Sequence, residues 1–233
     1  MENPINNLEK YIEHTLLKPD ITDEMLVKLY DEAIQNRFLG VCINPKYVKH
    51  AKNYLKNTDI KVVTVIGFPL GANTFEVKAY EAQVAVEDGA DELDMVIDIA
   101  AIKNKEYIQA ENGIKVVVGE AGGKPVKVIL ETDLLTRDEI AEACNICVKA
   151  GANFVKTSTG FTKGGVGATV ENIKLMHEIV APHGLQVKAS GGVRDRETAL
   201  KMIEAGAVRI GTSSGVEIVS RQEIPAPINE VEY

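Results

Sequence analysis

Residues 147–160, CVKAGANFVKTSTG, carry the chain from the end of a helical pattern into a β-rich run, and this junction decides the fold. The helical pattern stops at Gly151, a residue type that often ends helices, and the apolar run begins at Phe154. The same Gly-Ala junction recurs at Gly89 and Gly206, so the three glycines are 62 and 55 residues apart. Each interval is long enough for about two strand–helix units. We therefore predict a chain in which strands and helices alternate.

Eight β-rich runs fit this alternation, and helical patterns separate them. The runs are residues 11–17, 41–43, 62–66, 93–97, 126–130, 154–157, 186–189 and 208–211. Residues 114–118 also favour a strand by composition, but a strand there would break the alternation, so we expect a helix.

Eight strands, each followed by a helix and with no linker-like segment, predict a closed (β/α)8 TIM barrel of the α/β class. We expect one domain over residues 1–233, with a short mobile tail from about residue 222. The alternative is an open, doubly wound sheet. A dinucleotide-binding sheet of that kind would normally carry a Gly-x-Gly-x-x-Gly sequence after its first strand, and residues 39–44 contain none.

The composition is that of an ordinary globular chain, with 45% hydrophobic and 26% charged residues among 233. No run approaches the ~20 apolar residues that a membrane-spanning helix needs. The formal net charge of −8 argues against nucleic acids and anionic membranes as partners, and the absence of Trp argues against base-stacking surfaces. An anionic ligand would therefore need a locally built site.

The three cysteines are too few, and odd in number, for a disulfide framework. Cys144 and Cys147 match the Cys-x-x-Cys pattern of redox and zinc sites, but they fall on one stripe of the helical pattern over residues 137–150. We interpret them as core packing residues. The polar N-terminus lacks the apolar stretch of a secretory signal, so we expect a cytoplasmic protein.

Charged residues interrupt four strands that should read as continuous apolar runs if both faces of a parallel sheet are covered. They are Asp94, Lys127, Lys156 and Lys188, on four successive strands of the predicted barrel. A buried unpaired charge costs several kcal/mol, so each must be paired, neutralised or functional. Barrel chemistry takes place at the C-terminal ends of the strands, and we expect all four side chains to point into one mouth.

Two lysines held close together in a site of low dielectric constant do not both remain charged without a large penalty, so one should release its proton more readily. A neutral lysine is the nucleophile that forms a Schiff base with a carbonyl substrate, and Asp94 would hold the other lysine charged for proton transfer. The residues alone do not decide between Lys156 and Lys188. The alternative interpretation is that the lysines only form ion pairs at the bottom of the barrel or extend to solvent.

Glycine-rich segments follow the last three expected strands. They contain Gly160, then Gly191 and Gly192, and finally the pair Ser213 and Ser214. Barrels commonly bind phosphate after strands seven and eight, where backbone N–H groups at a helix start attract an anion. The sequence therefore predicts a phosphate site that does not depend on net charge.

Eight short motifs resemble those of the deoxyribose-phosphate aldolases, a family of class I aldolases. They span about residue 11 to about residue 219 and are HTLLKP (14–19), VCINP (41–45), TVIGFPLG (64–71), ELDMV (92–96), KVILET (127–132), VKTSTGF (155–161), KASGGVR (188–194) and IGTSSG (210–215). The combination of Lys-Thr-Ser-Thr-Gly with the later Lys-x-x-Gly-Gly is highly specific. The resemblance implies a (β/α)8 barrel without a metal or other cofactor, assembled as a homodimer or homotetramer.

The resemblance also implies roles for individual residues. Lys156 matches the Schiff-base lysine, Lys188 the partner that promotes its deprotonation and exchanges a proton, and Asp94 the acid that relays the proton and orients the lysine. The residues that match phosphate contacts are Gly160, Gly191, Gly192, Ser213 and Ser214. The residues that match positions lining the pocket are Cys42 and Lys127.

The implied reaction is the reversible cleavage of 2-deoxy-D-ribose 5-phosphate to acetaldehyde and D-glyceraldehyde 3-phosphate, a step of carbohydrate catabolism. Two rival functions stay open: an enzyme acting on another sugar phosphate, and a barrel that only binds one. Two departures from the family pattern, at residues 98–101 and in the loop 162–169, concern substrate fit more than chemistry. Tyr233, in the expected tail, is a hypothetical proton donor, and His14 is either a donor at the mouth or a structural residue.

Overall fold

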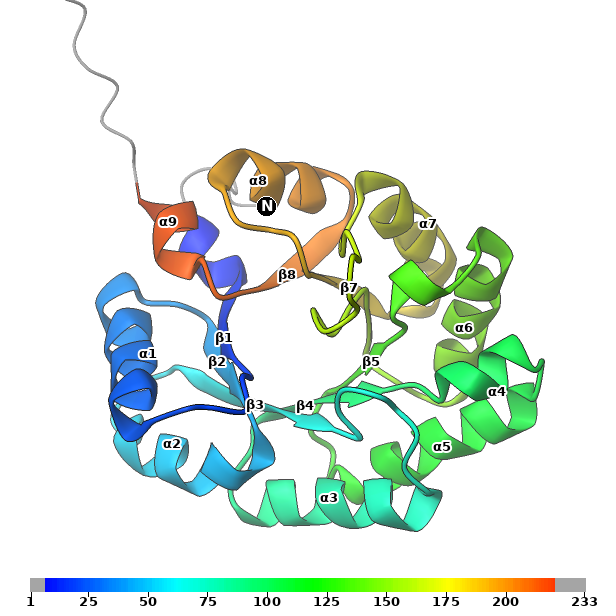
Figure 1. Ribbon diagram of the computed structural model, residues 1–233, viewed down its shortest axis with the longest axis horizontal. Helices are drawn as coiled ribbons and strands as arrows, with labels where there is room; N and C mark the ends of the chain where they lie inside the picture. The colour runs from blue at the N-terminus through cyan, green and yellow to red at the C-terminus, as the bar shows by residue number, and fades with distance from the viewer. Residues whose placement is uncertain (1–6, 221–233) are drawn as a thin grey trace, which may run out of the picture.

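The computed structural model describes residues 7–220, in which eight parallel strands close into a barrel in the order β1 to β8 and helices surround it (Figure 1). The strands are β1 (Ile12–Leu16), β2 (Gly40–Ile43), β3 (Lys61–Ile66), β4 (Glu92–Val96), β5 (Val126–Ile129), β6 (Phe154–Lys156), β7 (Gln186–Ser190) and β8 (Ala207–Thr212). The predicted single-domain (β/α)8 barrel is confirmed. The predicted tail and Tyr233 lie outside the described residues.

The α-helices alternate with these strands. They are α1 (Asp23–Asn36), α2 (Val48–Tyr54), α3 (Phe75–Glu87), α4 (Ile99–Lys103), α5 (Tyr107–Glu120), α6 (Arg137–Lys149), α7 (Val170–Val180), α8 (Arg196–Glu204) and α9 (Gly215–Val219). Short 3-10 segments occur at Leu8–Tyr11, Pro45–Tyr47, Thr132–Leu134 and Ala181–His183. Within residues 7–220, no helix is long and apolar enough to cross a membrane.

Residues 114–118 are helical, as predicted. They belong to α5, where Ile114 and Val117 are buried against the barrel. An additional short helix, α4, begins after Asp98 and was not predicted from the sequence. The Asp98 carboxylate accepts a hydrogen bond of 2.9 Å from the Ala101 amide, so this departure from the family motif is an N-cap that starts a helix.

The three Gly-Ala junctions end α3, α6 and α8. Gly89, Gly151 and Gly206 have φ angles of +101°, +78° and +115°, a region that residues with a side chain rarely adopt. After Gly89, the Ala90 amide donates to the Ala85 carbonyl over 2.9 Å, which satisfies a free carbonyl of the last helical turn. The glycines thus reverse the chain direction directly before β4, β6 and β8.

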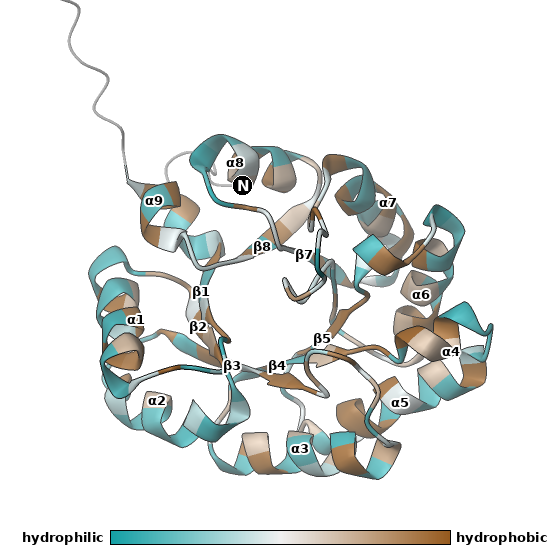
Figure 2. Ribbon diagram, in the orientation of Figure 1, coloured by the Kyte–Doolittle hydropathy of each residue, from teal (hydrophilic) through white to brown (hydrophobic). Residues whose placement is uncertain are grey.

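Two apolar cores result from the closed barrel. The large core lies between the strands and the helices, and Figure 2 shows hydrophobic residues on the strands and on stripes of the surrounding helices. Cys144 and Cys147 are buried in this layer with free thiols, so their interpretation as packing residues is confirmed. The second core is small and consists of Leu17, Cys42, Val63 and Val65, with Phe68 packed against it. The four members of this second core come from the loop after β1, from β2 and from β3.

Candidate active site

Charged side chains from β1 and from β4 to β8 occupy the interior of the barrel. Strand register brings them together, because Lys127 lies opposite Asp94, and Lys188 lies opposite both Lys156 and Arg209. Alternate residues of a strand face the same side, so residues in register on neighbouring strands have side chains that meet. The predicted convergence of the four charged residues is therefore a consequence of barrel closure.

Asp94 is at the centre of this group. Its Oδ2 atom accepts hydrogen bonds from Lys156 Nζ at 2.8 Å and from Lys188 Nζ at 2.6 Å. Its Oδ1 atom accepts from Lys127 Nζ at 2.9 Å. Asp94, Lys127 and Lys188 are fully buried, and Lys156 is 3% exposed. One carboxylate thus fixes the positions of three lysine side-chain nitrogens.

Three further charged residues lie in the interior and were not among the predicted site residues. Glu92 Oε2 is 2.7 Å from Lys127 Nζ, Glu13 forms a short hydrogen bond with Lys188, and Arg209 Nε is 3.7 Å from Glu13 Oε1. Glu13 and Arg209 lie within expected strands, so the criterion that identified Asp94 applied to them as well, and Glu92 directly precedes an expected strand. We refer to the seven residues together as the charge cluster. Its members are Glu13, Glu92, Asp94, Lys127, Lys156, Lys188 and Arg209.

Electrostatic pairing sets the protonation of the cluster. Burial alone would raise the pKa of Asp94, but the positive charges of three lysines outweigh burial and hold that pKa well below its ordinary value. Burial would likewise raise the pKa of Glu13, and Lys127 and Lys188 together lower it. For Lys188, burial favours a lower pKa, and the carboxylates of Asp94 and Glu13 raise it above the ordinary value. Glu13 and Asp94 are therefore anions, and Lys188 is a cation.

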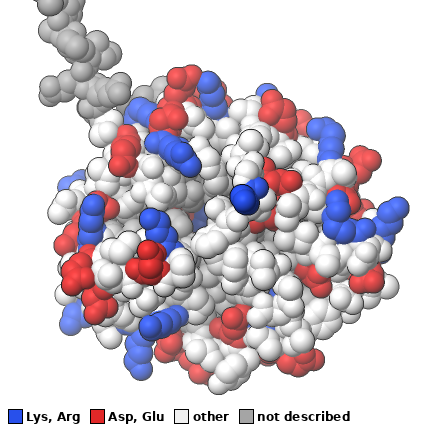
Figure 3. Space-filling view, in the orientation of Figure 1, with Lys and Arg blue, Asp and Glu red and all other residues white. Residues whose placement is uncertain are grey.

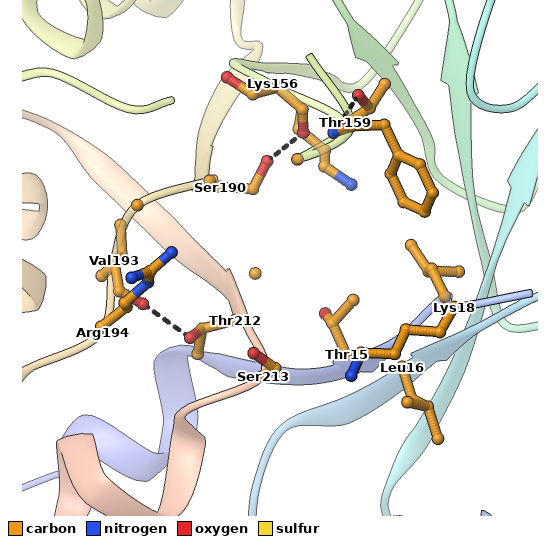
Figure 4. Close-up of a pocket in the computed structure, with 17 residues that line it drawn as sticks. Thr15, Leu16, Lys18, Lys156, Thr159, Ser190, Val193, Arg194, Thr212 and Ser213 are labelled. Atoms are coloured by element: carbon orange, nitrogen blue, oxygen red, sulfur yellow. Dashed lines mark hydrogen bonds between the residues drawn. The ribbon is translucent and has the colours of Figure 1, made fainter. Parts of the chain in front are cut away.

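A cavity of about 250 Å³ opens beside the cluster, and Figure 4 shows the side chains that line it. The residues come from the ends of β1, β6, β7 and β8 and from the loops that follow them. They are Thr15, Leu16, Leu17, Lys18, Lys156, Ser158, Thr159, Gly160, Phe161, Ser190, Gly191, Gly192, Val193, Arg194, Gly211, Thr212 and Ser213. The cavity thus lies at the C-terminal ends of the strands, where barrel chemistry is expected.

Lys156 is the member of the charge cluster that lines this cavity. Lys188 is fully buried and is absent from the lining, although its register partner is Lys156. This difference separates the two lysines that the sequence left equivalent, because an electrophile in the cavity can reach only one of them. Asp94 and Lys188 are absent from the lining, and the Asp94 carboxylate connects Lys188 to Lys156.

The predicted phosphate residues divide into two groups. Gly160, Gly191, Gly192 and Ser213 line the cavity, as the glycine-rich segments suggested. Ser214 is not among the lining residues, and its amide donates instead to the Thr212 hydroxyl over 2.9 Å. Figure 3 shows that most charged side chains on this face lie around its rim. Lys18, Lys156 and Arg194 line the cavity as well, so an anion there would meet basic side chains in addition to backbone N–H groups.

Cys42 and Lys127 do not line the cavity, contrary to what the resemblance implied. Cys42 is fully buried in the small inner core. Lys127 pairs in register with Phe154, two residues before Lys156, and therefore lies deeper in the barrel. The difference arises because a strand residue two positions earlier is almost 7 Å further from the mouth.

The loop between β6 and α7 is fixed against the loop after β7. The Asp133 carboxylate accepts from the Val166 and Gly167 amides, each at 2.9 Å. A Cβ atom on Gly167 would lie 2.4 Å from the carbonyl carbon of Gly191, so the two loops pack backbone to backbone. Glu131, which has a φ angle of +59°, accepts hydrogen bonds from the amide and hydroxyl of Thr159. Carboxylates behind the glycine loops thus hold them in place.

His14 has a structural environment. Its Nε2 atom lies 2.8 Å from Glu32 Oε2, and its ring packs against Phe38 at a centroid distance of 5.2 Å. Both partners lie on the helix side of β1, away from the cavity. Among residues 7–220, no group of three or more His, Cys, Asp or Glu side chains is placed to hold a metal ion.

Comparisons with known proteins agree with this geometry. The family model of the DeoC/LacD aldolases matches residues 9–221. The deoxyribose-phosphate aldolase of Staphylococcus carnosus is 56% identical over 214 residues, which cover 92% of this chain and 96% of the relative. That of Thermococcus kodakarensis is 57% identical over 216 residues, which cover 91% and 95%. The solved tetrameric structure of deoxyribose phosphate aldolase from Aeropyrum pernix aligns with a TM-score of 0.85 at 34% identity, over 94% of this chain and 91% of the other.

Proposed function

Because the chain belongs to the DeoC/LacD family of aldolases, which are carbon–carbon lyases, we propose that it reversibly cleaves 2-deoxy-D-ribose 5-phosphate. The products are acetaldehyde and D-glyceraldehyde 3-phosphate, and Lys156 forms the covalent intermediate. The observation that carries this assignment is the position of Lys156. It joins a buried ionic network to a cavity that the glycine loops after β6 and β7 also line.

The chemistry begins with the neutral amine of Lys156. It attacks the aldehyde carbon C1 of the open-chain sugar, and loss of water gives an imine between Nζ and C1. The protonated imine accepts the electron pair of the C2–C3 bond as the C3 hydroxyl loses its proton. D-glyceraldehyde 3-phosphate leaves, and an enamine remains on Lys156. Protonation at C2 and addition of water then release acetaldehyde and restore the amine.

Neighbouring groups prepare Lys156 for these steps. The Lys188 ammonium shares Oδ2 of Asp94 with Lys156, and its positive charge disfavours a second positive charge beside it. Asp94 holds the Lys156 nitrogen in one place, so the amine and the aldehyde carbon meet with little loss of orientational freedom. In this proposal Asp94 and Lys188 exchange the proton that Lys156 releases and regains.

The phosphate group occupies the glycine-lined part of the cavity. Gly160, Gly191 and Gly192 have φ angles between +76° and +82°, so their amides take directions that residues with a side chain rarely reach. With Ser213 they offer donors to a phosphate oxygen. Ser214 takes part only if the loop after β8 rearranges.

We further propose a cytoplasmic homo-oligomer that needs neither a metal nor another cofactor. Three free thiols in the chain support a reducing compartment. A tetrameric relative from Aeropyrum pernix supports self-association. The lysine imine supplies the electron sink for carbon–carbon cleavage.

Trapping of the imine tests the assignment. Incubation with acetaldehyde followed by sodium borohydride should leave a reduced adduct on Lys156, which peptide mass spectrometry locates. Lys18 also lines the cavity and is exposed, so Lys18→Met is the matched control and should keep the adduct. Lys156→Met should lose the adduct, and its cleavage rate should fall by at least about 10³-fold.

The substrate is tested separately by comparing cleavage of 2-deoxy-D-ribose 5-phosphate with that of other sugar phosphates and of unphosphorylated 2-deoxyribose. The phosphorylated deoxy sugar should have the highest kcat/KM. An adduct on Lys18 alone, or an undiminished adduct in Lys156→Met, would refute the role of Lys156. A higher kcat/KM for another sugar phosphate would refute the substrate.

A further inference from the structure

The charge cluster contains one more cation than anion. Its three carboxylates are Glu13, Glu92 and Asp94, and its four basic groups are Lys127, Lys156, Lys188 and Arg209. The sum is one positive charge when every group is ionised and zero when one lysine is neutral. A surplus charge inside a barrel of low dielectric constant is unfavourable, so the cluster has a built-in preference for one neutral lysine.

The lysines differ in how many carboxylates compensate them. Lys127 Nζ lies within 4 Å of carboxylate oxygens of Glu13, Glu92 and Asp94. Lys188 contacts two of these carboxylates, and Lys156 contacts Asp94 alone. Lys156 is therefore the least compensated lysine, and it is also the one that reaches the cavity.

Arg209 is the member of the cluster whose charge does not depend on pH. Its guanidinium carbon lies 5.4 Å from the centroid of the Phe154 ring, its Nη1 atom donates to the Val208 carbonyl over 3.1 Å, and its side chain is 20% exposed. A guanidinium keeps its charge at any pH at which the protein is folded. It lies beside Lys188 in register and pairs with Glu13 at 3.7 Å. Its positive charge is therefore present whichever protons the lysines carry.

We propose that Arg209 is a positioning residue for the reaction, whose permanent charge makes the cluster neutral when Lys156 is a free amine and Lys127 and Lys188 are charged. The inference rests on the proposed function, in which that amine is the nucleophile. The groups that face Lys156 and its partners are the cluster members on β1, β4, β5, β7 and β8, together with the Cys42 thiol on β2. Burial raises the pKa of Cys42, so the thiol is neutral and leaves the charge sum unchanged.

The rate of imine formation with acetaldehyde, measured from about pH 5 to about pH 9, tests this inference. Samples of the full chain are quenched with borohydride and the adduct on Lys156 is quantified. Arg209→Met removes the charge but keeps an unbranched apolar side chain beside Phe154. The acid limb of its profile should move up by about one pH unit, while the plateau at high pH is kept. This shift corresponds to a rate about fivefold lower at the midpoint of the wild-type limb and about tenfold lower well below it.

Three further variants complete the test. Arg209→Lys keeps the charge and should restore the wild-type profile, and Arg137→Met removes an exposed arginine of α6 and should leave the profile unchanged. Glu92→Gln removes a negative charge that contacts Lys127, so its acid limb should move in the opposite direction, to lower pH. A purely structural role would lower the rate at every pH and would not give shifts of opposite sign.

The outcomes separate this inference from the proposed function. If the wild type forms no adduct on Lys156, the proposed function fails. If the wild type forms it and Arg209→Met keeps an unshifted limb, only the role of Arg209 is refuted. If Arg209→Met does not fold, as judged by its unfolding transition, Arg209→Gln takes its place: an upward shift of its acid limb supports the inference, and no shift or a downward shift overturns it.

Discussion

Asp94→Asn is the substitution that should most disturb the interior of the barrel. The carboxylate accepts three charge-assisted hydrogen bonds, at 2.6, 2.8 and 2.9 Å, and is fully buried. Each such bond contributes about 1.5–3 kcal/mol, but the three share one acceptor group and are not additive. Asparagine keeps one oxygen for Lys127 and turns an amide donor toward Lys156 and Lys188. Since removal of one partner from a buried ion pair typically costs about 3–5 kcal/mol, we expect that loss of unfolding free energy.

Urea unfolding at neutral pH measures the effect, and Asp91→Asn provides a matched control. Asp91 directly precedes β4, lies 3.0 Å from Lys52 and accepts a hydrogen bond of 2.8 Å from the Val62 amide, but its side chain is 26% exposed. A solvated ion pair contributes about 1 kcal/mol or less, so Asp91→Asn should cost no more than that. Equal losses for the two variants, or a loss below about 1 kcal/mol for Asp94→Asn, would refute the reasoning.

Acidification adds a second readout for the same pair of proteins. The pKa of Asp94 in the folded chain is well below the ordinary value of 3.8, because the lysine charges outweigh burial. The ionised carboxylate therefore contributes stability that is complete above the unfolded pKa and is lost as the pH falls toward the folded one. The stability difference between wild type and Asp94→Asn should be constant near neutral pH and shrink below about pH 4.

Two other expectations concern the loops and the thiols. Gly167→Ala should lower stability by about 2 kcal/mol or more and raise KM for the phosphorylated substrate more than for the unphosphorylated sugar, because a Cβ atom would meet the Gly191 backbone at 2.4 Å. Gly151→Ala is the control: its φ angle is +78°, and an added Cβ atom would meet no atom within 4 Å, so it should cost only about 1 kcal/mol of backbone strain and leave KM unchanged. Equal stability losses for the two variants would contradict the packing argument. Burial raises the pKa of Cys144 to about 12 and that of Cys147 well above its ordinary value. Both thiols should therefore resist alkylation by iodoacetamide at about pH 8 until urea unfolds the chain. Rapid labelling of the folded protein would count against their burial.

The sequence by itself determined the alternation of strands and helices and the presence of charges inside strands. Both are local properties: Gly89, Gly151 and Gly206 end helices through their own backbone conformation, and Lys156 interrupts an apolar run of only a few residues. A pattern with period two also shows which residues share a face of a strand. The fold and the candidate Schiff-base lysines could therefore be predicted without a structure.

Only the tertiary structure decided which lysine meets the cavity and which charges pair. Closure of the barrel places β1 beside β8, so Glu13 comes into contact with Lys188, 175 residues away in the chain, and with Arg209. The depth of a residue along the barrel axis depends on the stagger between strands, and this stagger places Lys156 at the cavity and Lys127 below it. Ion pairing and solvent access are properties of the space between strands, and a linear pattern of residue types does not contain them.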